Sequence, residues 1–170
     1  SPYAATKKAG ELLGHVYHHL YNIDMIHLRF FTVYGPRQRP DLAIHKFTKL
    51  ILDDDEIPFY GNGSTARDYT YIDDIIDGIL KSVLYLESRA KVFEIINLGE
   101  NEVVTLSEML SELEKALGKS ANKKMLPMQA GDVLKTNADI TKAKTLIGYE
   151  PTTNFQKKKK KFVEWFLGNR

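Results

Sequence analysis

The sequence contains no cysteine among its 170 residues. This absence excludes disulfide bonds, cysteine-ligated zinc and thiol catalysis, and it suits a reducing compartment. No apolar run approaches the roughly 20 residues that a membrane span needs, and no charged-then-apolar signal sequence leads the chain. We therefore expect a cytoplasmic protein that does not use a membrane as its partner.

An excess of charge of one sign is also missing. Lysine and arginine total 24, aspartate and glutamate total 22, and the formal net charge is +2. So small an excess does not favour nucleic acid or a membrane surface as the main partner. The hydrophobic content of 43% gives the chain enough apolar residues for one globular domain with its own core.

Several catalytic and cofactor motifs are absent as well. The chain has no G-x-S-x-G elbow, P-loop or H-E-x-x-H motif. His15 and His19 are four residues apart on a predicted helix but lack an identifiable third ligand, so no metal site is predicted. The segment GNGSTAR (61–67) lacks the third glycine of a dinucleotide fingerprint and leads into a predicted strand. The main dinucleotide-binding half is therefore expected to be missing.

The elements that are present alternate between helices and strands. Apolar spacing predicts helices over 2–22, 43–55, 73–88, 105–118, 139–148 and 154–167, and apolar runs predict strands at 25–31, 57–60, 67–72, 92–99 and 123–128. Thr105 and Glu108 form a capping box, and Asp73 or Asp74 and then Asp139 are the expected caps of two other helices. This alternation predicts an α/β architecture.

The first residues combine a helix start with a tyrosine and a lysine. Ser1 and Pro2 suit an N-cap and the first helical position, so we expect the chain to be a piece of a longer protein. Tyr3 and Lys7 are four residues apart and share a helix face. The lysine ammonium and the helix dipole both favour a phenolate, which would suit a general base. The same spacing also fits a surface pair on an amphipathic helix.

A run of five lysines, Lys157 to Lys161, lies inside the last predicted helix. Phe155, Phe162 and Phe166 would share one face of this helix, so one or two lysines must pack their stems along it. We expect the run to form a mostly solvated face.

Four stretches in order, SPYAATKKAGELL, LRFFTVYGPRQRPD, GNGSTARDYTYIDD and QAGDV with TNADITKA, resemble the second half of the extended short-chain dehydrogenase/reductases. These are NAD-dependent nucleotide-sugar epimerases and dehydratases, and GPRQRPD with AIHKF looks most like UDP-glucuronate and similar UDP-sugar 4-epimerases. The resemblance implies an α/β fold: the C-terminal part of a Rossmann-like enzyme with its small mixed α/β substrate-binding domain, and most of the dinucleotide-binding sheet missing.

The resemblance also implies a division into domains. Residues 1–40 would be a remnant of the NAD-binding domain, comprising the catalytic helix and the following strand and loop. Residues 41–170 would mainly form the nucleotide-sugar-binding domain, with 69–98 returning to the Rossmann part.

By this resemblance Tyr3 is the catalytic base for the C4 hydroxyl of a nucleotide sugar, and Lys7 assists it. Both would bind the nicotinamide end of NAD, which accepts and returns the C4 hydride. Arg67 would contact the diphosphate, Asp132 the ribose, and Pro58 and Tyr60 the uracil. The other residues expected near the substrate are Thr32, Tyr69, and Gln129, which stands where some relatives have an arginine. Arg37 and Arg39 would meet a sugar carboxylate or fix their loop.

The chain is thus expected to be a C-terminal fragment of an NAD-dependent UDP-sugar 4-epimerase that is inactive alone. One alternative is an enzyme half that regains activity with a separately supplied N-terminal part. Others are a nucleotide-sugar 4,6-dehydratase fragment and a non-catalytic nucleotide-sugar-binding or self-association module. Apolar residues on the first helix predict self-association, for example as a homodimer.

Overall fold

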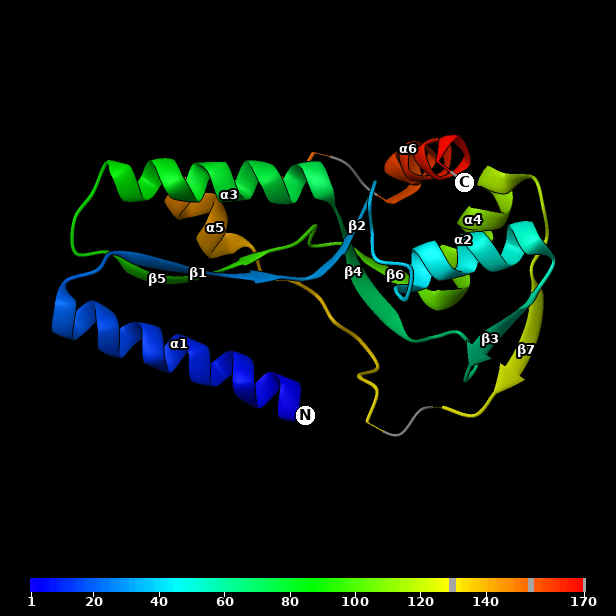
Figure 1. Cartoon of the computed structure of the whole chain (residues 1–170), viewed down its shortest axis with the longest axis horizontal. Coiled ribbons are helices and arrows are strands. Elements are labelled where there is room, and N and C mark those ends of the chain that lie inside the picture. Colours follow the sequence, from blue (N-terminus) through cyan, green and yellow to red (C-terminus); the bar gives the residue numbers. More distant parts are fainter. Residues whose placement is uncertain (129–130, 153–154, 170) are drawn as a thin grey trace.

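The computed structural model describes residues 1–128, 131–152 and 155–169 as two lobes joined by β2 and β4 (Figure 1). The helices are α1 (Pro2–Tyr21), α2 (Ala43–Asp53), α3 (Ile72–Glu87), α4 (Leu106–Leu117), α5 (Thr141–Ile147) and α6 (Phe155–Gly168). The strands are β1 (Met25–Phe30), β2 (Thr32–Tyr34), β3 (Glu56–Tyr60), β4 (Ala66–Tyr71), β5 (Phe93–Leu98), β6 (Val103–Thr105) and β7 (Asn122–Leu126). The predicted α/β class is confirmed.

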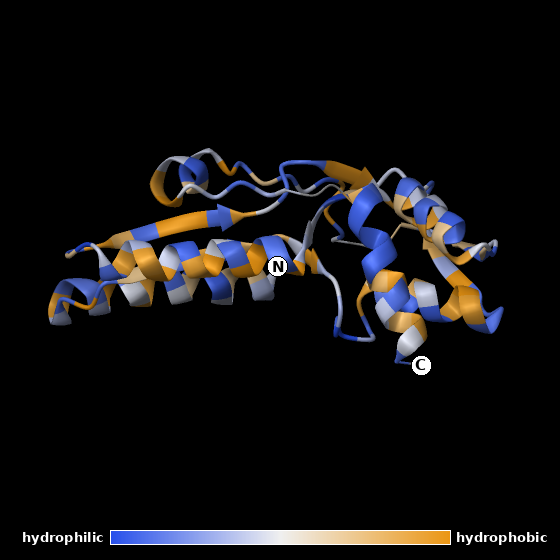
Figure 2. Cartoon of the chain, turned by 90° about the horizontal axis from the view of Figure 1, so that it is seen from above, coloured by the Kyte–Doolittle hydropathy of each residue, from blue (hydrophilic) through white to orange (hydrophobic). Residues whose placement is uncertain are grey.

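The smaller lobe is built on the parallel pair β1–β5, in which Met25 lies opposite Phe93 and Phe30 opposite Leu98. Helix α1 covers one face of these strands, while α3 and α5 cover the other (Figure 1). The main buried hydrophobic cluster of this lobe consists of Ile75, Leu98, Ala138, Ile140, Ala143 and Tyr149. Hydrophobic residues also recur along the long helices of this lobe (Figure 2), where many are exposed.

Helix α1 begins as the sequence predicts and rests on the sheet through a charged contact. The Ser1 hydroxyl accepts a hydrogen bond from the Ala4 N–H at 3.2 Å, with Pro2 in the first turn. Glu11 is the buried residue of this helix. Its carboxylate accepts two hydrogen bonds from Arg29 of β1, at 2.5 and 2.7 Å. Because a bidentate arginine–carboxylate pair fixes both position and orientation, it holds α1 in register with β1.

The larger lobe contains the three-stranded sheet β2–β4–β6, in which β2 is parallel and β6 antiparallel to β4, and the separate parallel pair β3–β7. Helices α2, α4 and α6 pack together over a core of aliphatic and aromatic side chains. Its fully buried members include Tyr34, Ile44, Ile51, Ile57, Met109, Leu110, Leu113, Phe155 and Phe162. No helix in the described part of the chain is long and apolar enough to cross a membrane.

Two helix caps differ from the prediction. Tyr71 is the N-cap of α3, without a side-chain cap hydrogen bond, and the Asp74 carboxylate instead accepts hydrogen bonds from the backbone and hydroxyl of Thr152. Ile140 is the N-cap of α5, although Asp139 still accepts a hydrogen bond from the Thr141 N–H at 2.9 Å. The capping box of Thr105 and Glu108 is confirmed.

The prediction of a solvated face for the lysine run is wrong for two of its members. Lys158 and Lys159 are only 9% and 6% exposed. The Lys158 ammonium lies 4.4 Å from the centroid of the Tyr71 ring and 3.7 Å from Asp74 Oδ2, and Lys159 pairs with Glu112 of α4. Burial lowers the pKa of Lys159. The reason is tertiary: α6 packs between α4 and β4, so these lysines meet carboxylates on other elements.

Candidate functional site

A cavity of about 390 Å³ opens between β2, β3, β4 and the start of α2. Its lining contains six of the residues that the sequence predicts to contact substrate: Thr32, Pro58, Tyr60, Arg67, Tyr69 and Asp132. Gln129, the seventh, lies outside the described residues. The volume falls within the range of small-molecule sites, and the residues converge from segments far apart in the sequence.

Strand β4 supplies two side chains to this cavity, because successive side chains of a strand point to opposite faces. Arg67 and Tyr69 point into the cavity, whereas Asp68 between them points to the opposite face of the strand. Tyr69 is nearly buried, with its ring 5.4 Å from Phe155 and 6.5 Å from Tyr34. Burial raises the pKa of Tyr69 to about 12, so its hydroxyl stays protonated at neutral pH and can donate a hydrogen bond.

Arg67 and Asp132 form an ion pair at the cavity wall. Arg67 Nη2 lies 2.5 Å from Asp132 Oδ1, and Nη1 donates to the backbone oxygen of Ala66 at 2.9 Å. Among the described ion pairs, Arg67 pairs with neither Asp68 nor Asp73. A guanidinium fork suits a diphosphate, and a carboxylate suits two vicinal hydroxyls. A donor fork and an acceptor pair therefore lie side by side at one wall of the cavity.

Tyr3 and Lys7 lie outside this cavity, on the exposed first turns of α1. Tyr3 is 71% exposed, and the Lys7 ammonium lies 5.4 Å from the centroid of its ring. Arg39 donates two hydrogen bonds to the Asp41 carboxylate, at 3.0 and 2.5 Å, and these bonds raise the pKa of the Arg39 guanidinium.

Lys46 and Gln38 also line the cavity and were not predicted from the sequence. Lys46 lies in the first turns of α2, away from the buried face of that helix formed by Ile44 and Phe47. The Gln38 side chain donates to the Val33 backbone oxygen at 3.0 Å and accepts from a backbone N–H of α2 at 3.1 Å. It thereby fixes the loop between β2 and α2. The sequence feature that could have identified Lys46 is its position in the first turns of a helix that follows a Gly- and Pro-rich loop.

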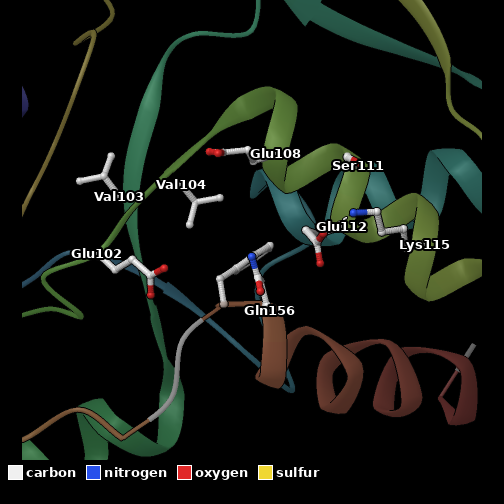
Figure 3. A pocket seen from close by; sticks show the side chains of 9 residues that line it. Glu102, Val103, Val104, Glu108, Ser111, Glu112, Lys115 and Gln156 are labelled. Atoms are coloured by element: carbon white, nitrogen blue, oxygen red, sulfur yellow. Dashed lines mark hydrogen bonds and ion pairs between the residues drawn. The ribbon is translucent and has the colours of Figure 1, made fainter.

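A second cavity, of about 160 Å³, lies between β6, α4 and α6 (Figure 3). Two of its three carboxylates are already engaged: Glu108 accepts from the Thr105 N–H and hydroxyl, and Glu112 pairs with Lys115 at 2.7 Å. None of the predicted site residues that the structure describes lines it. Within the ranges that the structure describes, no group of three or more histidines, aspartates and glutamates could hold a metal ion. The first cavity is therefore the candidate ligand site.

The chain is similar to known proteins in sequence. A family model described as GDP-mannose 4,6 dehydratase matches residues 1–162. A UDP-glucuronate 4-epimerase of Thermodesulfobacterium geofontis is 44% identical over 170 residues, covering 99% of this chain and 51% of that protein. UDP-glucuronate 4-epimerase 5 of Arabidopsis thaliana is 43% identical over 181 residues, covering 99% of this chain and 42% of its own length.

A solved structure is similar as well: the UDP-glucuronic acid 4-epimerase of Bacillus cereus in complex with UDP-glucuronic acid and NAD. It has a TM-score of 0.93 and 40% sequence identity, covering 100% of this chain and 54% of that one. The present chain thus spans about half the length of the relatives it matches.

Proposed function

The chain belongs to the GDP-mannose 4,6 dehydratase family, within the extended short-chain dehydrogenase/reductases, and on this premise we propose that it forms part of an NAD-dependent UDP-glucuronate 4-epimerase. It supplies the nucleotide-sugar site and the helix with the tyrosine and lysine. The observation that carries the proposal is the cavity that six predicted substrate residues line together. The similar Bacillus cereus protein, with UDP-glucuronic acid and NAD bound, supports the same substrate.

In this proposal the cavity holds the nucleotide. Arg67 turns its guanidinium from Asp132 to the diphosphate, and Asp132 accepts hydrogen bonds from the ribose hydroxyls. The backbone around Pro58 and Tyr60 lies beside the uracil. Thr32 and Tyr69 contribute hydroxyl donors toward the sugar side. Gln129, outside the described residues, contributes a side-chain amide. Lys46 adds a second cation near the phosphates.

The exposed face of α1 fits the nicotinamide ribose of NAD. Both Tyr3 and Lys7 extend from the helix surface on the same side, and Lys7 has no ion-pair partner among the described contacts. Tyr3 Oη removes the proton from the sugar C4 hydroxyl and later returns it, while Lys7 hydrogen-bonds the ribose and keeps a positive charge beside Tyr3. When bound, NAD supplies the hydride acceptor and donor for C4.

The partner and the domains belong to the same proposal. Leu12, Leu13, Val16 and Leu20 form an apolar stripe on α1 that faces solvent, and we assign this stripe to contact with a second copy of the chain. Residues 1–40, with 69–98, belong to the NAD-binding part. The remainder of 41–170 mainly forms the part that binds the nucleotide sugar.

A calorimetric titration tests the proposed site. The chain should bind UDP saturably, and Arg67→Ala should weaken binding by about 10- to 100-fold, since a hydrogen bond to a charged group contributes ~1.5–3 kcal/mol. Arg89→Ala is the matched control, because Arg89 stacks on Tyr85 at the end of α3, away from the cavity. NAD serves as the comparison ligand. Silence toward UDP, or equal affinity of Arg67→Ala and the unaltered chain, would contradict the proposed site.

The reaction itself is tested by complementation. The remaining half of the Thermodesulfobacterium geofontis relative, produced separately, is added to this chain, and epimerisation of UDP-glucuronate is assayed. Turnover that depends on Tyr3 supports the proposal, with Tyr17→Phe on the same helix as the control. UDP binding without turnover in the reconstituted pair would favour a binding module instead.

A further inference from the structure

Asp68 is a charged residue of β4 that the proposed reaction does not use. It lies between the cavity residues Arg67 and Tyr69, but its side chain is on the opposite face of the strand and is fully buried. Among the described residues no lysine, arginine or histidine is within ion-pair distance of its carboxylate. A buried carboxylate without a cation is costly unless hydrogen bonds satisfy its oxygens.

Four hydrogen bonds do so. Asp68 Oδ1 accepts from the Thr70 hydroxyl at 3.0 Å and the Glu100 N–H at 2.8 Å, and Oδ2 accepts from the N–H groups of Asn101 at 3.0 Å and Ala138 at 3.1 Å. Three of the four partners are backbone N–H groups, which can only donate. Both oxygens therefore accept, and a carboxyl side chain offers an acceptor at each of the two positions.

Backbone hydrogen bonds also join β4 to the segment that carries Asp132. The Ala66 N–H donates to the Leu134 oxygen at 2.8 Å, and the Thr136 N–H donates to the Ala66 oxygen at 3.1 Å. Two residues further along both segments, the Ala138 N–H donates to the Asp68 carboxylate and extends this attachment. The carboxylate is thus a fixed point shared by β4 and the segment of Asp132.

The turn after β5 packs directly onto the same carboxylate. A Cβ atom at Gly99 would lie 2.3 Å from the Ala138 Cβ and 3.0 Å from Asp68 Oδ2. The position therefore excludes a side chain, and the two segments touch without space between them. A change at Asp68 would be transmitted to the segment of Ala138, since the packing leaves no room to absorb it.

We propose that Asp68 is a positioning residue for the nucleotide site: it holds the segment of Asp132 against β4, so that Asp132 faces Arg67 across the cavity. This inference rests on the proposed function, in which Arg67 and Asp132 bind the nucleotide. Asp68 itself touches no ligand. In Asp68→Asn the amide nitrogen would meet backbone N–H donors, and at least one buried donor would lose its acceptor.

A double-mutant cycle tests this role. UDP affinity is measured by calorimetry for Asp68→Asn, Asp132→Ala, the double variant and the unaltered chain, and thermal unfolding is recorded in parallel. Asp68→Asn should weaken UDP binding about tenfold, which corresponds to the loss of one hydrogen bond to a charged group. In the Asp132→Ala background the same change should have little further effect, because Asp68 acts through Asp132. Asp77→Asn, on an exposed ion-paired carboxylate of α3, is the control.

Two results would overturn the role of Asp68: unchanged UDP affinity in folded Asp68→Asn, or losses that simply add in the double variant. If Asp68→Asn does not fold, Thr70→Val removes only the hydroxyl donor to Oδ1 and enters the same cycle.

If the unaltered chain does not bind UDP, the proposed nucleotide site is refuted, and this result does not decide the role of Asp68. The role of Asp68 is then judged by hydrogen exchange at the N–H groups of Ala66 and Thr136. Faster exchange in Asp68→Asn supports the positioning role, and unchanged exchange overturns it.

Discussion

The two lobes bury their hydrophobic side chains to very different extents. In the larger lobe Leu110 and Phe162 are fully buried, whereas on the helices of the smaller lobe Leu13 is 61% and Leu84 63% exposed. The larger lobe closes its core around the cavity. The smaller lobe places its helices on a sheet of only two strands, which leaves their outer faces uncovered. The lobe with the candidate ligand cavity therefore buries its own core, whereas the lobe with Tyr3 and Lys7 leaves apolar helix faces exposed.

The largest loss of stability should follow from truncating a core side chain of the larger lobe. Phe162 is completely buried and contacts the rings of Trp165 and Phe166. Phe162→Ala should lower the free energy of unfolding by about 3–5 kcal/mol, since it removes a large apolar side chain and leaves a cavity. Urea unfolding measures the change. A loss below about 1 kcal/mol would mean that the core of the larger lobe does not govern stability.

Glu100, at the junction of the two lobes, should make the stability of the chain depend on pH. Burial raises the pKa of the Glu100 carboxyl to about 8, and the neighbouring charges of Asp74, Asp68 and Glu102 add to this, while Lys158 opposes it. The Oε2 atom of Glu100 has no hydrogen-bond partner among the described residues. The native state therefore keeps a proton on Glu100 that the unfolded chain releases from its ordinary pKa of 4.5 upward.

Between pH 4.5 and about 8 the native state thus binds more protons than the unfolded state, and the contribution of Glu100 to stability falls as pH rises. Glu100→Gln should be increasingly more stable than the unaltered chain across this interval, with no further change above it. Urea unfolding at several pH values measures the difference. Glu164→Gln, at an exposed position of α6, should follow the unaltered chain. Parallel curves for the chain and Glu100→Gln would contradict the raised pKa.

The sequence predicts local features well and distant partners poorly. Periodicity and caps place α1 and the Thr105–Glu108 box because the interacting residues are within one helical turn. The buried heads of Lys158 and Lys159 could not be predicted, since their partners lie on α3 and α4. The same applies to Asp68, whose acceptor role depends on backbone groups about 32 to 70 positions away. For the candidate site, family motifs named the residues, and the structure brings six of them into one cavity.

The smallest effect on folding is expected from the exposed face of α1. Leu13→Ser should change the free energy of unfolding by less than about 0.5 kcal/mol, because the side chain already faces solvent in the isolated chain. The same variant should weaken self-association, since it interrupts the apolar stripe assigned to a second copy. Light scattering over a range of concentrations measures association, and Glu87→Ser at the exposed end of α3 is the control. A chain that stays monomeric would refute the assigned contact, and the uncovered face of α1 would then require a different protein segment to cover it.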